Sequence, residues 1–178
     1  MKLLIIGHAR HGKDTVAEMI GQHFGLTYEA SSQAAADIFI YDELKDKYGY
    51  ETPEECFVDR MNHRAEWHDM ICEYNKDDKA RLAKGILERA DIYVGMRSSA
   101  EIKECINQAL FDVVIGVYNP RLPHEPEDSF NIDLFADADI IIPNGGDLWD
   151  LRVKVYKFIN PLVHHGLPVE SYEDETRG

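Results

Sequence analysis

Two glycines and a lysine near the N-terminus have a spacing that suits the binding of phosphate groups. Four residues separate Gly7 from Gly12, and Lys13 follows at once, which is the G-x-x-x-x-G-K pattern. Glycines allow a short loop to turn its backbone N–H groups inward, and the lysine adds a positive charge. An apolar run at residues 2–6 precedes the loop, and apolar residues at helical spacing follow it over residues 13–24. A strand, a glycine loop and a helix in this order predict a phosphate-binding loop, in preference to a chance glycine turn.

The two residues after the lysine have side-chain oxygens that suit Mg²⁺. The pattern usually has a serine or threonine directly after the lysine, whereas this chain has Asp14 and then Thr15. Mg²⁺ prefers oxygen ligands and binds carboxylates directly or through water. We therefore expect Asp14, Thr15 or both at a magnesium ion; the alternative is that Asp14 only favours the positive N-terminus of the helix. The backbone N–H groups of Arg10 and His11 are expected at the phosphates.

Two arginines lie where the ligand-binding edge of a parallel sheet is expected. Arg97 comes directly after the predicted strand 91–95, and ligands of such sheets bind beyond the carboxyl ends of the strands. There Arg97 is expected to clamp a phosphate with two hydrogen bonds, unless it pairs with Glu101 four residues on. Arg121 lies in the proline-rich loop 119–131, where it either neutralises a transferring phosphoryl group or is an ordinary loop cation.

A polar helical segment is the predicted site of a second substrate. Arg60, Arg64 and Trp67 recur at helical spacing, so they are expected to share one side of a helix. Two cations and an aromatic ring on that side suit a phosphate and a stacked base; a solvated face with Trp67 in the core is the alternative. A phosphate acceptor needs no general base, whereas a hydroxyl acceptor does. The candidates for that base are Asp14, Asp37 and Asp42.

Short apolar runs alternate with helical patterns along the chain. This order predicts an α/β fold with a parallel central sheet and right-handed crossovers. Residues 1–165 are expected to form one domain, with a helical insertion at about 32–90, a lid loop at about 119–131 and a polar tail at 166–178. The strand signals lie at residues 2–6, 26–30, 91–95, 112–118 and 138–142.

Within the insertion, the clearest helix start is Thr52-Pro53, with Glu55 completing a capping box. The helix that begins there is expected to run to Ile71. A second helix is expected over residues 75–89.

The composition argues against several classes of protein. The chain has 178 residues, 44% of them hydrophobic, which fits one globular domain. A net charge of −14 disfavours broad contact with nucleic acid. The chain has no apolar run of about 18 residues and no signal-peptide pattern, so we expect no membrane partner and a cytoplasmic location. The three cysteines form no CxxC pair and the histidines lack zinc spacing, so neither disulfides nor a transition-metal site is expected.

Taken together, these motifs resemble the bacteriophage deoxynucleoside monophosphate kinases, a branch of the P-loop nucleotide kinase superfamily. The resemblance rests on the Gly-Lys-Asp-Thr ending of the glycine loop at residues 12–15 and on the Gly-Met-Arg-Ser segment at residues 95–98. It rests also on the strand and turn at residues 138–146, before the last helix. The motifs occur in the same order over most of the chain.

The resemblance implies a three-layer α/β/α P-loop kinase fold with a helical acceptor-binding insertion. It implies ATP and Mg²⁺ as cofactors, and transfer of the γ-phosphate to a (deoxy)nucleoside monophosphate in the host cytoplasm of a phage. It places Lys13 and Arg97 at phosphates, and Asn144 and Gly145 near the adenine. The residues expected to act in catalysis are therefore Lys13, Asp14, Arg97 and Arg121.

Other acceptors and another class remain open. The phage kinases that phosphorylate 5-hydroxymethyldeoxyuridine within DNA are also similar, which makes DNA a second acceptor. A lid poor in arginine favours that alternative, and the charge of −14 opposes it. A non-catalytic nucleotide sensor or GTPase-like switch is less favoured, because the nearest match to an Asn-Lys-x-Asp motif, residues 75–78, precedes the strand at 91–95. The sequence leaves a homodimer open.

Overall fold

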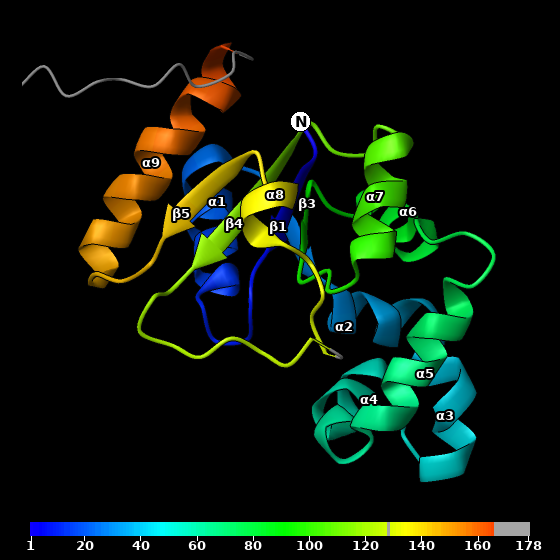
Figure 1. Cartoon of the computed structure of the whole chain (residues 1–178). Coiled ribbons are helices and arrows are strands. Elements are labelled where there is room, and N and C mark those ends of the chain that lie inside the picture. Colours follow the sequence, from blue (N-terminus) through cyan, green and yellow to red (C-terminus); the bar gives the residue numbers. More distant parts are fainter. Residues whose placement is uncertain (128, 166–178) are drawn as a thin grey trace, which may run out of the picture.

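Five parallel strands form the central sheet around which the helices pack (Figure 1). In this computed structural model, which describes residues 1–127 and 129–165, the strand order across the sheet is β2-β3-β1-β4-β5. All the pairings are parallel, which confirms the predicted α/β sheet. The strands are β1 (Leu3–Ile6), β2 (Tyr28–Ala30), β3 (Ile92–Val94), β4 (Val113–Tyr118) and β5 (Ile140–Pro143).

Helices cover both faces of this sheet, so the fold has the three expected layers. α1 and α9 pack against each other on one face, and the remaining helices lie toward the other face (Figure 1). The helices are α1 (Lys13–Phe24), α2 (Ser31–Ala35), α3 (Tyr41–Tyr48), α4 (Pro53–Asp59), α5 (Arg64–Tyr74), α6 (Arg81–Leu87), α7 (Ser99–Asn107), α8 (Leu134–Asp137) and α9 (Leu148–His165).

The central strand β1 has no exposed side chain, as its continuous apolar run predicts. Leu3 and Ile5 pack in the core under α1 and α9, whereas Leu4 and Ile6 pack in the core on the opposite face. This alternation follows from the period of two residues in a strand. Because β1 lies between β3 and β4, the loop that follows it emerges at the middle of the sheet's carboxyl edge.

The helical insertion is more broken than the sequence predicts. Thr52 caps α4 as expected, since its hydroxyl accepts a hydrogen bond from the Glu55 N–H at 3.2 Å. The Glu55 carboxylate, however, accepts from the Glu51 N–H at 2.7 Å, so only half of the capping box forms. The helix expected to reach Ile71 is interrupted by a 3₁₀ turn at Arg60–Asn62, after which α5 begins. Residues 60 and 64 therefore do not belong to one continuous helix.

The helix predicted over residues 75–89 begins late, because Asn75 connects two segments instead. Its side-chain carbonyl accepts a hydrogen bond from the Leu82 N–H at 3.0 Å, near the start of α6. Its amide donates to the Glu101 carboxylate of α7 at 2.8 Å. Asn75 is 2% exposed, so these bonds replace water for a buried polar group.

Two further differences concern the chain beyond β4. The short helix α8 was not predicted; Asp133 caps it by accepting hydrogen bonds from the Phe135 and Ala136 N–H groups. The last helix extends to His165, with Pro161 inside it. The predicted polar tail at 166–178 lies outside the described residues. Within the described part of the chain, no helix is long and apolar enough to cross a membrane.

Replacing Asn75 with alanine should destabilise the fold by roughly 2–4 kcal/mol, because it leaves the Leu82 N–H and the half-buried Glu101 carboxylate without this partner. Chemical denaturation of Asn75→Ala measures the loss. Asn62→Ala is the matched control: the Asn62 side chain is exposed and donates to Asp59, so we expect a change within about 0.5 kcal/mol. Equal stability of the two variants would show that Asn75 does not connect the insertion to α7.

Candidate phosphate-binding site

The glycine loop after β1 has the backbone shape that its sequence requires. Gly7 and Gly12 have φ angles of +153° and +100°, a region that favours glycine. A Cβ atom at Gly7 would overlap the Val117 carbonyl oxygen of β4, and one at Gly12 would overlap the Asn144 amide. Each glycine thus lets another segment approach the loop closely. Arg10 also has a positive φ, +66°, at the outer turn of the loop.

Lys13 lies inside this loop with its ammonium group directed at the loop backbone. Its side chain is 8% exposed, and Nζ donates a hydrogen bond to the His8 carbonyl oxygen at 2.8 Å. Burial lowers the pKa of Lys13, and the positive charge of Arg97 lowers it further. A buried cation near a second cation favours an anion between them, as expected for a phosphate site.

Two buried histidines of the loop hold the segment that follows β4. His11 accepts a hydrogen bond at Nδ1 from the Asn119 N–H, and its Nε2 lies 3.3 Å from the Pro123 carbonyl oxygen, to which it donates. His8 accepts at Nδ1 from the Glu125 N–H at 3.1 Å, and its ring stacks on His124. Burial is the main cause that lowers the pKa of both loop histidines, so both favour the neutral form that can accept these bonds.

The acidic residue of that segment, Glu125, lies between the two halves of the site. One carboxylate oxygen accepts a hydrogen bond from the Ala9 N–H of the loop at 2.6 Å. The other pairs with Nη1 of Arg97, beyond β3, at 2.5 Å. Partial burial acts to raise the pKa of Glu125, but the bonds from Arg97 and Ala9 outweigh it, and the pKa is lowered overall. Glu125 is therefore an anion held where a phosphate is expected.

Sequence reasoning identified Arg97 but missed Glu125. Arg97 was expected at a phosphate or paired with Glu101; it pairs with Glu125 instead, while Glu101 bonds to Asn75. Two of the three carboxylates proposed as a base are paired with other cations: Asp37 pairs with Arg89, and Asp42 pairs with Lys45. The third, Asp14, is exposed in the first turn of α1. No local pattern marks Glu125, because its partners are more than 25 residues away in the chain.

The predicted magnesium ligands lie in the first turn of α1. Asp14 is exposed and Thr15 is half-buried, directly after Lys13. Among the described residues neither side chain is committed to a hydrogen bond, so their oxygens are available for a cation or its water shell. A carboxylate and a hydroxyl beside a phosphate loop fit a hard cation such as Mg²⁺, and both stay predicted ligands.

The turn before α9 braces the phosphate loop from the other side. The Asn144 amide donates to the His11 carbonyl oxygen at 2.9 Å, and its backbone N–H donates to the Tyr118 carbonyl at 2.7 Å. Gly145 lies against the ring of Pro120. Asn144 thus contacts the phosphate loop and Gly145 the segment after β4, and their expected contact with adenine stays a prediction.

The single helix expected to align Arg60, Arg64 and Trp67 is not formed, and Trp67 takes its alternative place in the core. Arg60 bends back onto α4, where Nη1 donates to the Phe57 carbonyl oxygen at 2.8 Å and the guanidinium lies over the Phe57 ring. Trp67 is 4% exposed and packs in the core, which excludes it as a base-stacking platform. The 3₁₀ turn explains the failure, because it interrupts the helix that was to align Arg60, Arg64 and Trp67. Arg64 is exposed.

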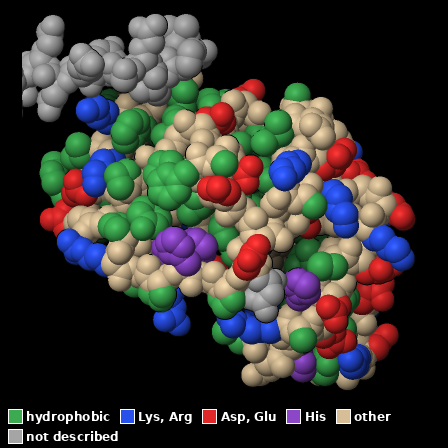
Figure 2. All heavy atoms as spheres, viewed as in Figure 1, with side chains coloured by type: hydrophobic (Ala, Val, Ile, Leu, Met, Phe, Trp, Pro, Cys, Tyr) green, Lys and Arg blue, Asp and Glu red, His purple; other side chains and the backbone are tan. Residues whose placement is uncertain are grey.

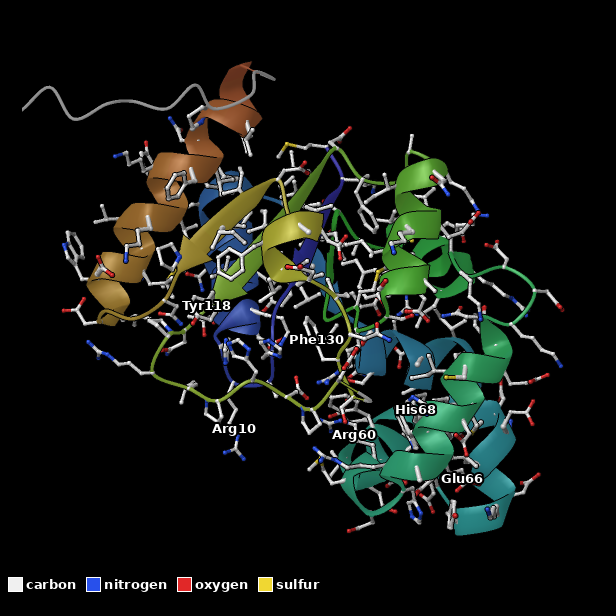
Figure 3. The ribbon with its side chains drawn as sticks, in the orientation of Figure 1. Arg10, Arg60, Glu66, His68, Tyr118 and Phe130 are labelled. Atoms are coloured by element: carbon white, nitrogen blue, oxygen red, sulfur yellow. The ribbon has the colours of Figure 1, made fainter. Side chains whose placement is uncertain are left out.

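Two further predicted cations, Arg10 and Arg121, are exposed. Arg10 points into solvent from the tip of the glycine loop, and Arg60 lies at the end of the insertion nearer the loop (Figure 3). Arg121 is exposed in the loop after β4, and its backbone N–H bonds to the Asn119 side chain at 2.9 Å. The structure therefore brings Lys13 and Arg97 together at one anion and leaves the catalytic role of Arg121 a prediction.

Comparison with known proteins supports the fold. No family model matches the chain, and no curated protein matches it. A dephospho-CoA kinase from Campylobacter jejuni is similar in structure, with a TM-score of 0.54 and 15% identity over 94% of this chain and 100% of that chain. A shikimate kinase from Bacteroides thetaiotaomicron aligns with a TM-score of 0.47 and 12% identity over 91% of this chain and 98% of that chain. The parallel sheet, the glycine loop and the similarity to the dephospho-CoA kinase together define the three-layer P-loop kinase fold.

Glu125→Gln should bind ATP more tightly than the wild type, because the bound nucleotide must displace the carboxylate from Ala9 and Arg97. A charged hydrogen bond is worth about 1 kcal/mol more than a neutral one, so the Kd should fall roughly fivefold. Calorimetric titration with ATP measures the change. Glu54→Gln, which changes an exposed carboxylate of α4, is the control and should leave the Kd unchanged. Weaker ATP binding by Glu125→Gln would show that Glu125 supports the nucleotide instead of competing with it.

Proposed function

We propose that this protein transfers the γ-phosphoryl group of ATP to a nucleotide-type acceptor, and that the acceptor is a (deoxy)nucleoside monophosphate. The observation that carries the proposal is the pair of cations around one anion position. Lys13 is buried in the glycine loop, Arg97 extends from the end of β3, and Glu125 joins the loop to Arg97. The fold similarity to a kinase supports the same class.

The chain's own groups account for the main steps of such a reaction. Loop N–H groups and Lys13 bind the β- and γ-phosphates, and Arg97 aligns the acceptor with the γ-phosphorus. An acceptor oxygen forms a bond to that phosphorus as the bond to the ADP oxygen breaks. Asp14 and Thr15 are the residues that would hold Mg²⁺, which neutralises charge on the phosphates when bound. An ionised phosphate acceptor needs no base.

One observation favours a second candidate, transfer to a hydroxymethyl group on a base in DNA. A neutral hydroxyl needs a base, and Glu125, which joins the Ala9 N–H to Arg97, is a carboxylate at the phosphate site itself. Arg60 does not join Arg97 as an acceptor-phosphate ligand, since it is bound to its own helix. The net charge of −14 still opposes binding of polymeric DNA, so the mononucleotide stays the first candidate.

Arg97 and Lys13 provide the test of this reaction. Arg97→Lys should lower kcat/KM about 10- to 150-fold, because a point charge does not replace a two-pronged clamp worth about 1.5–3 kcal/mol. Lys13→Ala should lower kcat more strongly while the fold is retained, as circular dichroism checks. Lys103→Ala, an exposed lysine of α7, is the control. Wild-type turnover by Lys13→Ala would refute the kinase proposal.

The acceptor is identified by a transfer screen with ATP labelled at the γ-phosphate. The acceptors offered are the four deoxynucleoside monophosphates, hydroxymethyl-dUMP and DNA that contains hydroxymethyluracil. We expect transfer to a free mononucleotide with a shallow dependence on salt. Transfer only to the polymer, with a steep log-linear loss of binding as salt rises, would establish the second candidate instead.

A further inference from the structure

A pocket of about 250 Å³ opens beside the phosphate loop, on the face of the sheet that carries α8. Cavities that hold drug-sized ligands usually measure about 300–1,000 Å³, so this pocket suits a ring fragment and not a whole nucleotide. Hydrophobic side chains gather on the surface over α8 and β5 (Figure 2). Tyr118 and Phe130, which line the pocket, lie below α8 at the edge where the strands end (Figure 3).

Aromatic rings form the walls of this pocket. The Tyr118 and Phe135 ring centres are 5.6 Å apart at 69°, and the Tyr118 and His124 centres are 5.8 Å apart at 79°. Phe130 packs on His8 of the loop with ring centres 4.4 Å apart. Several ring faces around one small space suit a planar ring, since bases stack on aromatic side chains.

The charges of the lining select against a phosphate in the pocket itself. Glu125, Glu127 and Asp133 line it, the first already bonded to Ala9 and Arg97 and the last capping α8, and none of the described lining residues is a lysine or an arginine. Carboxylates accept hydrogen bonds from ring N–H and amino groups and repel phosphate. The occupant should therefore be an uncharged ring with N–H donors.

The pocket and the phosphate site share two residues. His8 and Glu125 line the pocket, and the Glu125 carboxylate reaches Ala9 and Arg97. The pocket therefore adjoins the residue that pairs with Arg97. A nucleotide with its base in the pocket can direct its sugar and phosphate toward Arg97.

We propose that this pocket binds the base of the acceptor, a role that sequence reasoning had given to Trp67 of the insertion. The proposal rests on the proposed function in one respect, since only a phosphotransfer reaction makes the bound nucleotide an acceptor. The pocket itself is defined by its rings and carboxylates, which recognise a nucleobase with or without a phosphate attached. Binding of nucleosides, which lack phosphate, thus tests the pocket separately from the reaction.

The experiment titrates the wild type and variants with the four 2′-deoxynucleosides, using ligand-observed NMR. At least one nucleoside should bind, and Phe135→Ala should weaken it at least fivefold, because it removes one ring face. Phe135 is 66% exposed on α8, so its loss should spare the fold. Ile106→Ala, on α7 and 51% exposed, is the matched control and should bind like the wild type.

Two results would overturn the proposal: no nucleoside binds the wild type, or Phe135→Ala binds it as tightly as the wild type does. The failure of the proposed function gives a different pattern. If a nucleoside binds through Phe135 but no acceptor is phosphorylated, the base pocket stands and the kinase reaction does not. If an acceptor is phosphorylated and its KM is the same in Phe135→Ala, the reaction stands and the pocket does not.

Discussion

The arrangement of the site depends on one carboxylate that joins two separate parts of the chain. Glu125 accepts a hydrogen bond from the Ala9 N–H of the glycine loop and pairs with Arg97 beyond β3. Lys13, buried nearby, adds a second positive charge to the same small volume. Lys13 is buried, and a buried cation with no anion nearby is costly. In the described chain Glu125 supplies that anion.

The loop histidines connect this electrostatic arrangement to the fold. His8 and His11 are buried and accept hydrogen bonds from backbone N–H groups of the segment after β4. Each can accept only while neutral, and burial favours the neutral form by lowering the pKa. His8 thus helps to hold Glu125 at the loop, through a hydrogen bond between residues far apart in the chain. In the proposed reaction, a nucleotide that enters the loop competes with this carboxylate.

The sequence predicted those parts of the site that depend on residues adjacent in the chain. The glycine spacing placed the phosphate loop, since strand, loop and helix are contiguous in the chain. Arg97 was located because a residue just past a parallel strand must lie at the carboxyl edge. The prediction that Arg60, Arg64 and Trp67 share one side of an unbroken helix was wrong, because a 3₁₀ turn divides that helix. Neither Glu125 nor the aromatic pocket follows from a local pattern, because both depend on how a loop folds over distant residues.

The central claim is that Glu125 occupies the position that a nucleotide phosphate takes. The most direct measurement follows the Ala9 amide signal of ¹⁵N-labelled protein during an ATP titration, because that N–H bonds to Glu125 in the structure. The account predicts that the Ala9 signal shifts strongly as ATP saturates the protein. It predicts also that free Glu125→Gln protein starts from a different Ala9 shift and ends, with ATP bound, near the shift of the wild type. An Ala9 signal that stays fixed while ATP saturates the protein would contradict it.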